Sequence, residues 1–285
     1  MSNLAQIPTD YKKAFDEVLH QYLPKLNRVR TVFDEVTIDS GVTTHEYVRQ
    51  TQTYAAATGW TSFPAPNVIA DGSRPELESI GTEDATSTPV TYGHGYRMDR
   101  KIMTSGRPIQ QQFAMRHAKE AVDRLETDIN NSLITNMISN AAQSYSASAT
   151  WATTGDAVGD VIAAKNAFFD AAGGVQADFM ILNTNEMTDL QKDTRFQSTD
   201  YTSSRPLDNG GFTPRPLGLD YIVDPAMTTG SFLLGKKAEF GRMIVSENYT
   251  TLSTSEGAAG MTFDTIFTYI DQYHKPYLLM AGTGI

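Results

Sequence analysis

The sequence predicts an α+β fold organised around one very long helix and one long polar hairpin. Apolar residues recur at three- and four-residue steps between Gln110 and Ala142, which is the spacing of an amphipathic helix. Residues 42–49 and 90–97 alternate in the manner of strands, and they flank a stretch that is rich in proline and glycine. Shorter helical and extended patterns fill the second half of the chain, so both kinds of element are expected throughout.

The composition limits the classes of protein that remain. The chain has 285 residues, of which 40% are hydrophobic and 20% charged, which is typical of a globular protein with a sizeable core. Its 33 acidic residues against 23 basic ones would repel phosphates, unlike a sequence-independent DNA-binding protein. Cysteine is absent, which excludes disulfides and thiolate metal sites. Met1–Thr9 lacks the features of a signal peptide and no apolar run could span a bilayer, so we expect a soluble protein of cytoplasmic origin.

The first hundred residues predict an extended arm. Residues 11–30 have the pattern of a short helix that Pro24 ends or bends, and residues 32–38 are expected to be extended. The strand over 42–49 has no consistently apolar face, and the strand over 90–97 is expected to return from the tip of the arm. A polar hairpin on the order of fifty residues is hard to stabilise on its own subunit, so we expect it to lie on a neighbouring one.

The long helix has a continuous apolar stripe and otherwise carries charged and amide side chains. At 1.5 Å per residue it would be roughly 50 Å long, well beyond an average helix. A helix of that length needs more than one packing partner. The stripe consists of Ala118, Val122, Leu125, Ile129, Leu133 and Met137, widened by Ala121, Ile134, Ile138 and Ala141.

Residues 156–185 predict a helix, a buried strand and the start of a second helix. Gly173-Gly174 suits the end of the first helix, and residues 179–182 form the strand. Asn183 or Thr184 is expected to cap the second helix, with Glu186 placed to close the cap. A loop over 194–216 is followed by strands expected over 219–223, 231–234, 242–245, 263–273 and 277–280.

The order of these elements resembles the Hong Kong 97-type coat fold, which is shared by tailed-phage and tailed archaeal-virus major capsid proteins and by encapsulins. The most specific segments are VTIDSGVTTHEYVRQT (36–51), leading into the arm, and YRMDRKIMTSGRPIQQQFAMRHAKEAVDRLETDIN (96–130), entering the long helix. The middle is similar in WATTGDAVGDVIAAKNAFFDAAGG, ADFMILNTNEMTDLQKDTRF and GFTPRPLGLDYIVDP. The resemblance covers nearly the whole chain and rests on the order of its segments.

This resemblance implies a division of the chain and a mode of assembly. Some relatives begin with a scaffolding segment that is later removed; none precedes this arm, so scaffolding is expected from a separate protein or is unnecessary. Other relatives join subunits through an E-loop lysine, and no lysine occurs from Gly41 to Arg97, so we expect a non-covalent shell. The implied parts are an N-terminal arm and first strand (1–38), an E-loop (39–97), a P-domain with the long spine helix (98–150 and 249–285) and an axial A-domain (151–248).

No set of residues in the sequence predicts catalysis, a cofactor or a metal. The acidic pairs Glu76/Glu78 and Glu83/Asp84 lie in the polar arm, where solvated or intersubunit charge is the simpler interpretation. The glycines around His94 and Asp156 lack the context of a nucleotide-binding loop, and helix capping explains the second set. The histidines are dispersed, without metal-ligand spacing: His20, His45, His94, His117 and His274.

Candidate interface residues lie in the arm and on the long helix. Trp60 and Phe63 are aromatics in a polar segment, so we expect a neighbouring subunit to cover them, with packing inside the arm as the alternative. Arg49 and Arg74 are expected to pair with carboxylates on the next subunit's long helix. These carboxylates are Glu120, Asp123 and Glu126.

The axial loop supplies a second group of candidates. Its arginines are expected to meet carboxylates around a fivefold or sixfold axis, and solvated loop charge is the alternative. The group consists of Arg195, Phe196, Arg205 and Arg215.

The sequence therefore predicts a major capsid protein that forms hexamers and pentamers of an icosahedral shell. The shell would enclose double-stranded DNA without binding a particular sequence, and it would assemble in the host cytoplasm. Separate scaffolding, portal and cement proteins are its expected partners. The alternatives are an encapsulin nanocompartment around a cargo enzyme and, more remotely, a soluble α/β hydrolase or lectin.

Overall fold

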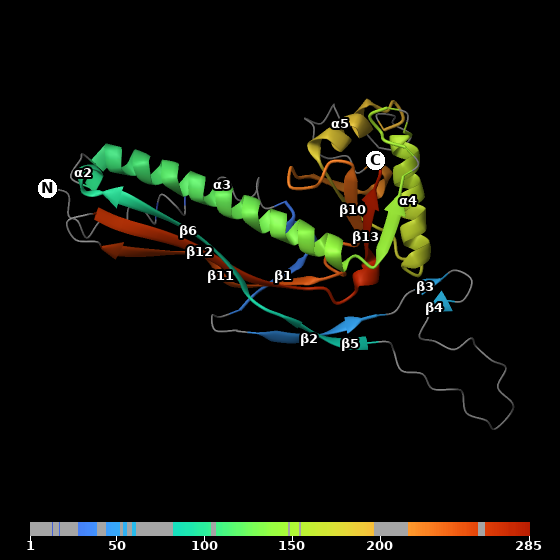
Figure 1. Cartoon of the computed structure of the whole chain (residues 1–285), viewed down its shortest axis with the longest axis horizontal. Helices are drawn as coiled ribbons and strands as arrows, with labels where there is room; N and C mark the ends of the chain where they lie inside the picture. The colour runs from blue at the N-terminus through green and yellow to red at the C-terminus, as the bar shows by residue number, and fades with distance from the viewer. Residues whose placement is uncertain are drawn as a thin grey trace, which may run out of the picture.

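The long helix is the axis of the structure, a computed structural model in which α3 runs from Arg107 to Asn140 (Figure 1). Its predicted apolar stripe is confirmed, because Ala118, Val122, Leu125, Ile129, Leu133 and Met137 are all buried. Ala121 and Ile134 widen the stripe as expected, whereas Ile138 is exposed. Glu126 and Asn130, expected among the polar faces of the helix, are buried as well. The stripe is therefore broader than its apolar residues alone indicate.

The structure describes residues 28–38, 44–51, 54–55, 59–60, 82–103, 107–147, 149–153, 155–196, 216–255 and 260–285, and residues 13 and 17 as isolated positions. The helix predicted over 11–30 therefore falls mostly outside the described residues. At its end, Arg30–Val32 form a short 3-10 turn, η2. None of the described helices is long and apolar enough to cross a membrane.

A four-stranded sheet lies along α3 in the order β1-β11-β12-β6. β1 is parallel to β11, and the other neighbours are antiparallel. The alternation of β12 buries Phe263, Phe267 and Tyr269 on the face toward the helix. The strands predicted over 242–245 and 263–273 are present and extend further. The strand bounds are β1 Asp34–Thr37, β6 Val90–Asp99, β11 Arg242–Ser255 and β12 Gly260–Gln272.

The arm hairpin has a different return strand from the one predicted. β2 (His45–Gln50) pairs with β5 (Thr82–Ser87), whereas β6 pairs with β12 from Val90 opposite Tyr269 to Asp99 opposite Gly260. The prediction that residues 90–97 return the hairpin is therefore wrong. The physical reason is that β6 carries aromatic side chains on alternate positions that pack toward α3, and β5 carries none. In the view of Figure 1 the hairpin lies below the sheet, and its Arg49 reaches Asn140 at the C-terminal end of α3.

A second sheet of five strands stands at the C-terminal end of α3, in the order β7-β13-β10-β8-β9 (Figure 1). β8 lies between β10 and β9, and all four of its residues are buried. β7 and β13, predicted to belong to the P-domain, join this sheet: β7 pairs with β13, and β13 pairs with β10, a strand predicted for the A-domain. The bounds are β7 Gln143–Ser146, β8 Phe179–Leu182, β9 Asp220–Val223, β10 Ser231–Gly235 and β13 Leu279–Thr283.

Two helices accompany this sheet, α4 (Ala157–Ala171) and α5 (Thr184–Lys192). α4 ends as predicted, since Gly173 and Gly174 have φ values of 67° and 90° and the Gly174 amide donates to the carbonyl of Phe169. The remaining short elements are β3 (Tyr54–Ala55), β4 (Gly59–Trp60), α2 (Arg100–Met103), η3 (Pro216–Gly218) and η5 (Pro276–Leu278).

The cap of α5 is confirmed in part. Asn183 accepts a hydrogen bond from the Asn185 amide, as expected of a cap residue. Glu186 does not close the cap as predicted. Its side chain turns inward, and Oε1 accepts from the Gly230 amide at 2.6 Å. The donor to Glu186 is therefore the Gly230 amide in the turn before β10, and not the amide of the cap residue that the sequence pattern predicted.

Candidate subunit interfaces

The root of the arm is anchored to the end of β12 by contacts between residues far apart in the sequence. The Gln50 amide donates to the carbonyl of His274 at 2.8 Å, and His274 Nδ1 donates to the Val48 carbonyl at 3.2 Å. Gln272 Nε2 donates to His45 Nδ1 at 2.6 Å. These bonds fix where the hairpin leaves the body. No local sequence signal indicates them, because they join segments more than two hundred residues apart.

Arg49 belongs to this root and is engaged within its own subunit. Its Nη1 donates to Asn140 Oδ1 at 3.3 Å, at the C-terminal end of α3, and its Nε lies 3.5 Å from Glu83 Oε1 across the hairpin. Arg49 thus joins both strands of the hairpin to the long helix. A pairing with the next subunit's helix, as predicted, would compete with these contacts.

The two faces of the hairpin are unequal. Tyr47 packs edge-on against the His274 ring at 5.0 Å, so the inner face rests on the body. The outer face is exposed, and Val48 at its centre keeps 52% of its surface open to solvent. Nothing among the described residues covers this face. A two-stranded hairpin is marginal alone, so this exposed face is a candidate contact surface for a partner.

The predicted carboxylates of α3 differ in their surroundings. Glu120 is half-exposed and bonds to Arg116 Nε at 3.1 Å, and this hydrogen bond lowers the pKa of Glu120. Asp123 is partly exposed. Glu126 is buried and paired with Arg30 of its own subunit, so the prediction that it meets a neighbouring arm is wrong. Its place in the helical stripe, between Leu125 and Ile129, is the signal that indicates burial.

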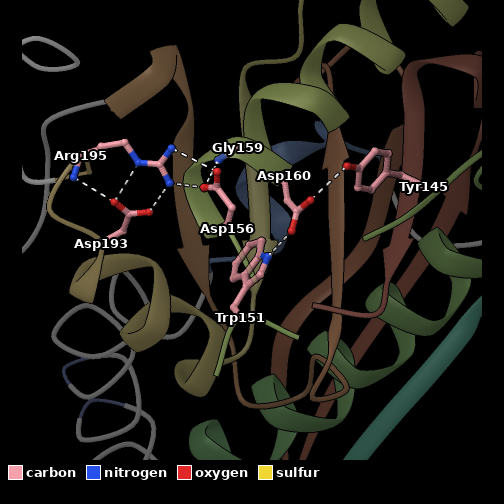
Figure 2. Close-up of polar contacts among 7 residues, drawn as sticks. All are labelled: Tyr145, Trp151, Asp156, Gly159, Asp160, Asp193 and Arg195. Carbon is pink, nitrogen blue, oxygen red and sulfur yellow. Dashed lines mark hydrogen bonds and ion pairs between the residues drawn. The ribbon is translucent and has the colours of Figure 1, made fainter. Parts of the chain in front are cut away.

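Arg195 and Phe196 are the last described residues before the rest of the predicted loop, and Figure 2 shows the contacts of Arg195. Arg195 pairs with Asp156 and, at 2.7 Å, with Asp193. These hydrogen bonds lower the pKa of both carboxyl groups. Phe196 is buried edge-on against Tyr221 at 5.5 Å, so its predicted role at an axial interface is corrected to one in the core of its own subunit.

The N-terminus of α4 is tied down by two carboxylates that face opposite ways (Figure 2). Asp156 caps the helix, since its Oδ1 accepts from the Gly159 amide at 2.8 Å. Asp160 accepts from Trp151 Nε1 at 2.9 Å and from the Tyr145 hydroxyl at 3.3 Å. Burial and the neighbouring Asp160 raise the pKa of Tyr145. The helix start is thereby connected both to Arg195 and to Tyr145 of β7.

Five predicted interface residues are not located by these contacts. Trp60 lies in β4, opposite Tyr54 of β3, and these two strands show no neighbouring subunit. The other four fall outside the described residues, and they are Phe63, Arg74, Arg205 and Arg215.

Replacing Asp156 by alanine is expected to lower the free energy of unfolding by about 1 kcal/mol, because the first turn of α4 loses its capping acceptor. The exposed pair with Arg195 adds little. Urea denaturation of the subunit measures the change. The matched control is Glu120→Ala, which removes an exposed pair without a cap and is expected to cost at most about 0.5 kcal/mol. Equal losses in the two variants would contradict the capping role.

The described residues contain no group of three or more histidine, aspartate or glutamate side chains that could hold a metal ion. An open cavity of about 360 Å³ lies between β7, α4 and η5, and none of its lining residues is charged. The residues are Ala142, Gln143, Ser144, Ala167, Ala171, Tyr277 and Met280.

Comparison with known proteins identifies the family. A family model described as phage capsid protein matches residues 82–270. Three solved structures are similar over most of their length: a virus-like particle from Pyrococcus furiosus (10% identity, 95% of this chain and 98% of that chain, TM-score 0.66), the capsid of Myoviridae phage XM1 (7%, 91% and 92%, 0.61) and Mycobacterium phage Che8 (11%, 85% and 85%, 0.59). No curated protein matches in sequence. The Hong Kong 97-like coat fold predicted from the sequence is therefore confirmed, and the chain belongs to the phage capsid protein family.

Proposed function

We propose that this capsid protein assembles through hexamers and pentamers into an icosahedral shell that encloses double-stranded DNA. The observation that carries the proposal is the β2–β5 hairpin, which is anchored at its root and whose outer face no described residue covers. Such a face is suited to a neighbouring subunit, because a shell repeats every contact and closes through many of them. The protein has a structural role, and we propose no catalytic activity.

The contacts that hold the shell together are proposed to be non-covalent. The segment from Gly41 to Arg97 contains no lysine, so an amine from this arm is not there to form a crosslink. The net charge of −10 suits a wall that surrounds DNA without gripping its phosphates. Many moderate contacts of this kind let misplaced subunits dissociate during growth, and their sum stabilises the closed particle.

The division into parts refines this proposal. The hairpin of residues 44–87 acts as the arm, and the unit of α4, α5 and the five-stranded sheet acts as the axial part. Arg195 then serves to hold the axial loop at its root rather than to meet an axis itself. Of the predicted helix carboxylates, Glu120 and Asp123 stay available to an arm. Assembly in the host cytoplasm, with separate scaffolding, portal and cement proteins, completes the proposal.

Electron microscopy of the expressed full-length protein tests it directly. We expect closed particles with hexameric and pentameric clusters, and virions are expected to contain nuclease-protected double-stranded DNA. Boiling in detergent should release a single 31.3 kDa band, because no covalent links join the subunits. A stable monomer or small oligomer under all assembly conditions would overturn the shell, and a ladder of multiples would overturn the non-covalent part.

An encapsulin nanocompartment around a cargo enzyme is the second candidate. The similarity to a virus-like particle over 95% of this chain favours keeping it. Particles purified from the native host separate the two, since a co-purifying oxidase or peroxidase without DNA would support the nanocompartment. A soluble hydrolase or lectin is no longer a candidate, because the chain belongs to a capsid family.

A further inference from the structure

A buried charge cluster joins the N-terminal part of the described chain to the long helix. Arg30, at the start of η2, is 2% exposed and lies 3.3 Å from Glu126 Oε1 on α3. Its second nitrogen bonds to Glu35 Oε1 on β1 at 2.8 Å. The guanidinium also lies 4.7 Å from the centre of the Phe267 ring, with the Tyr249 hydroxyl at 3.5 Å. One cation therefore connects η2, β1, α3, β11 and β12.

The pair between Arg30 and Glu126 is incompletely satisfied. Glu126 Oε2 and Arg30 Nε are buried, and neither has a hydrogen-bond partner among the described residues. An ionised carboxylate at this position has lost its hydrating water, and protein donors replace only part of those hydrogen bonds, which costs free energy. A protonated carboxyl avoids most of that cost. This position thus favours the neutral form of Glu126, although a cation lies beside it.

The ionisation of Glu126 agrees with this geometry. Burial raises its pKa to about 7, and the attraction of Arg30 only partly opposes the effect. Glu35 and Asp224 raise it further. The two charged neighbours Arg30 and Glu35 both belong to residues 30–35, so lifting this segment away removes them and admits water to the carboxyl.

We propose that the seating of residues 28–37 on the body of the subunit is linked to the uptake of one proton by Glu126. The seat consists of the Arg30 cluster and of β1, which pairs with β11 from Asp34 opposite Arg242 to Thr37 opposite Val245. Residues 28–37 are therefore held most tightly in mildly acidic solution, and they loosen from the body as the pH rises toward neutrality. The device belongs to the single subunit, so it stands whether or not the shell proposal does.

The direction follows from linkage. When the segment is seated, the pKa of Glu126 is about 7, and when water reaches it the value returns toward 4.5. The seated state therefore binds the proton more tightly, and seating weakens progressively from pH 4.5 to about 7 and is constant above that. Over the whole pH range, the equilibrium constant for seating of residues 28–37 changes by at most about 300-fold.

The other charged groups around the cluster are separable from Glu126. Burial also raises the pKa of Asp224, which follows β9, accepts from Asn130 and is faced by Arg28. Its contribution has the same sign. Asp34 pairs with Arg242 at the surface, and Glu35 is a third exposed, so neither is desolvated as Glu126 is. A variant at Glu126 alone therefore isolates the proposed proton.

Hydrogen exchange of the full-length protein, read by mass spectrometry between pH 5 and 8, tests the proposal. Rates are corrected for the intrinsic pH dependence of exchange. We expect the protection of amides in residues 33–38 to fall as the pH rises from 5 to 8, by up to about 70-fold, while the amides of β8 and β10 stay constant. In Glu126→Gln, which mimics the protonated carboxyl, most of this fall should disappear, and only the smaller contribution of Asp224 should remain.

The matched control is Glu35→Gln, which removes a carboxylate from the same arginine and should keep the pH dependence. Protection of residues 33–38 that is flat or rises with pH in the wild type would overturn the proposal. So would a Glu126→Gln variant that follows the wild-type curve. Should that variant fail to fold, the wild-type series with its internal reference strands still decides the outcome.

Discussion

Replacing Gly282 by alanine is expected to lower the free energy of unfolding by about 3 kcal/mol. Gly282 lies in β13 directly opposite Phe232 of β10. A Cβ atom there would overlap the Phe232 ring. The ring cannot easily move aside, because Phe232 is 1% exposed and packs against Tyr145 at 6.1 Å. The sheet must open or the ring must leave its place.

Gly93→Ala is the matched control for this prediction. Gly93 is also a strand glycine without a positive φ, but among the described residues a Cβ there would meet only the Thr265 carbonyl oxygen, at 3.9 Å. The substitution is expected to change stability by less than about 0.5 kcal/mol. Urea denaturation of both variants measures the difference. Similar stabilities of the two variants would show that the Phe232 ring can accommodate a side chain at position 282.

Replacing Val48 by lysine is expected to abolish or strongly impair shell assembly while leaving the subunit folded. Val48 is 52% exposed and pairs across the hairpin with Asp84, so a lysine there meets an opposite charge and does not weaken the free arm. In a shell, the outer face of the arm is proposed to be covered, and a buried charge would cost several kcal/mol at every copy. Even 2 kcal/mol per contact raises the concentration needed for assembly by about 30-fold.

Val48→Thr provides the control, because it keeps the branched shape without a full charge. Light scattering and electron microscopy report assembly, and thermal unfolding of the unassembled subunit reports folding. Assembly of Val48→Lys at the wild-type concentration would exclude this face as a shell contact. A lower unfolding temperature of the subunit would instead indicate a defect within the arm.

The sequence predicts the elements whose partners are local. The three- and four-residue spacing of the apolar residues places α3 correctly because the buried stripe of a helix repeats within one turn. The caps at Asp156 and Asn183 and the glycines after α4 are also foreseen, since each acts on a backbone group within a few residues. The order of such elements was enough to indicate the coat fold.

The candidate interfaces are harder to predict, because exposure depends on contacts between distant segments. Glu126 and Phe196 appear available in the sequence and are buried by Arg30 and Tyr221 in the structure. Arg49 appears free to reach a neighbour and is held by Asn140. A charge or an aromatic ring signals an interface only when its own subunit leaves it uncovered.

The arm hairpin separates what the sequence determines from what only the tertiary structure decides. The sequence by itself determined that one long helix and one long polar hairpin exist, since both are visible as periodicities along the chain. Only the tertiary structure decided which strand returns the hairpin. Residues 82–87 and 90–97 both alternate, and pairing with β2 or with β12 is a choice between partners some forty and some hundred and seventy positions away. The apolar face of β6 has to be covered by α3, and this requirement decides that β6 pairs with β12. Strand periodicity alone carries no information about that pairing.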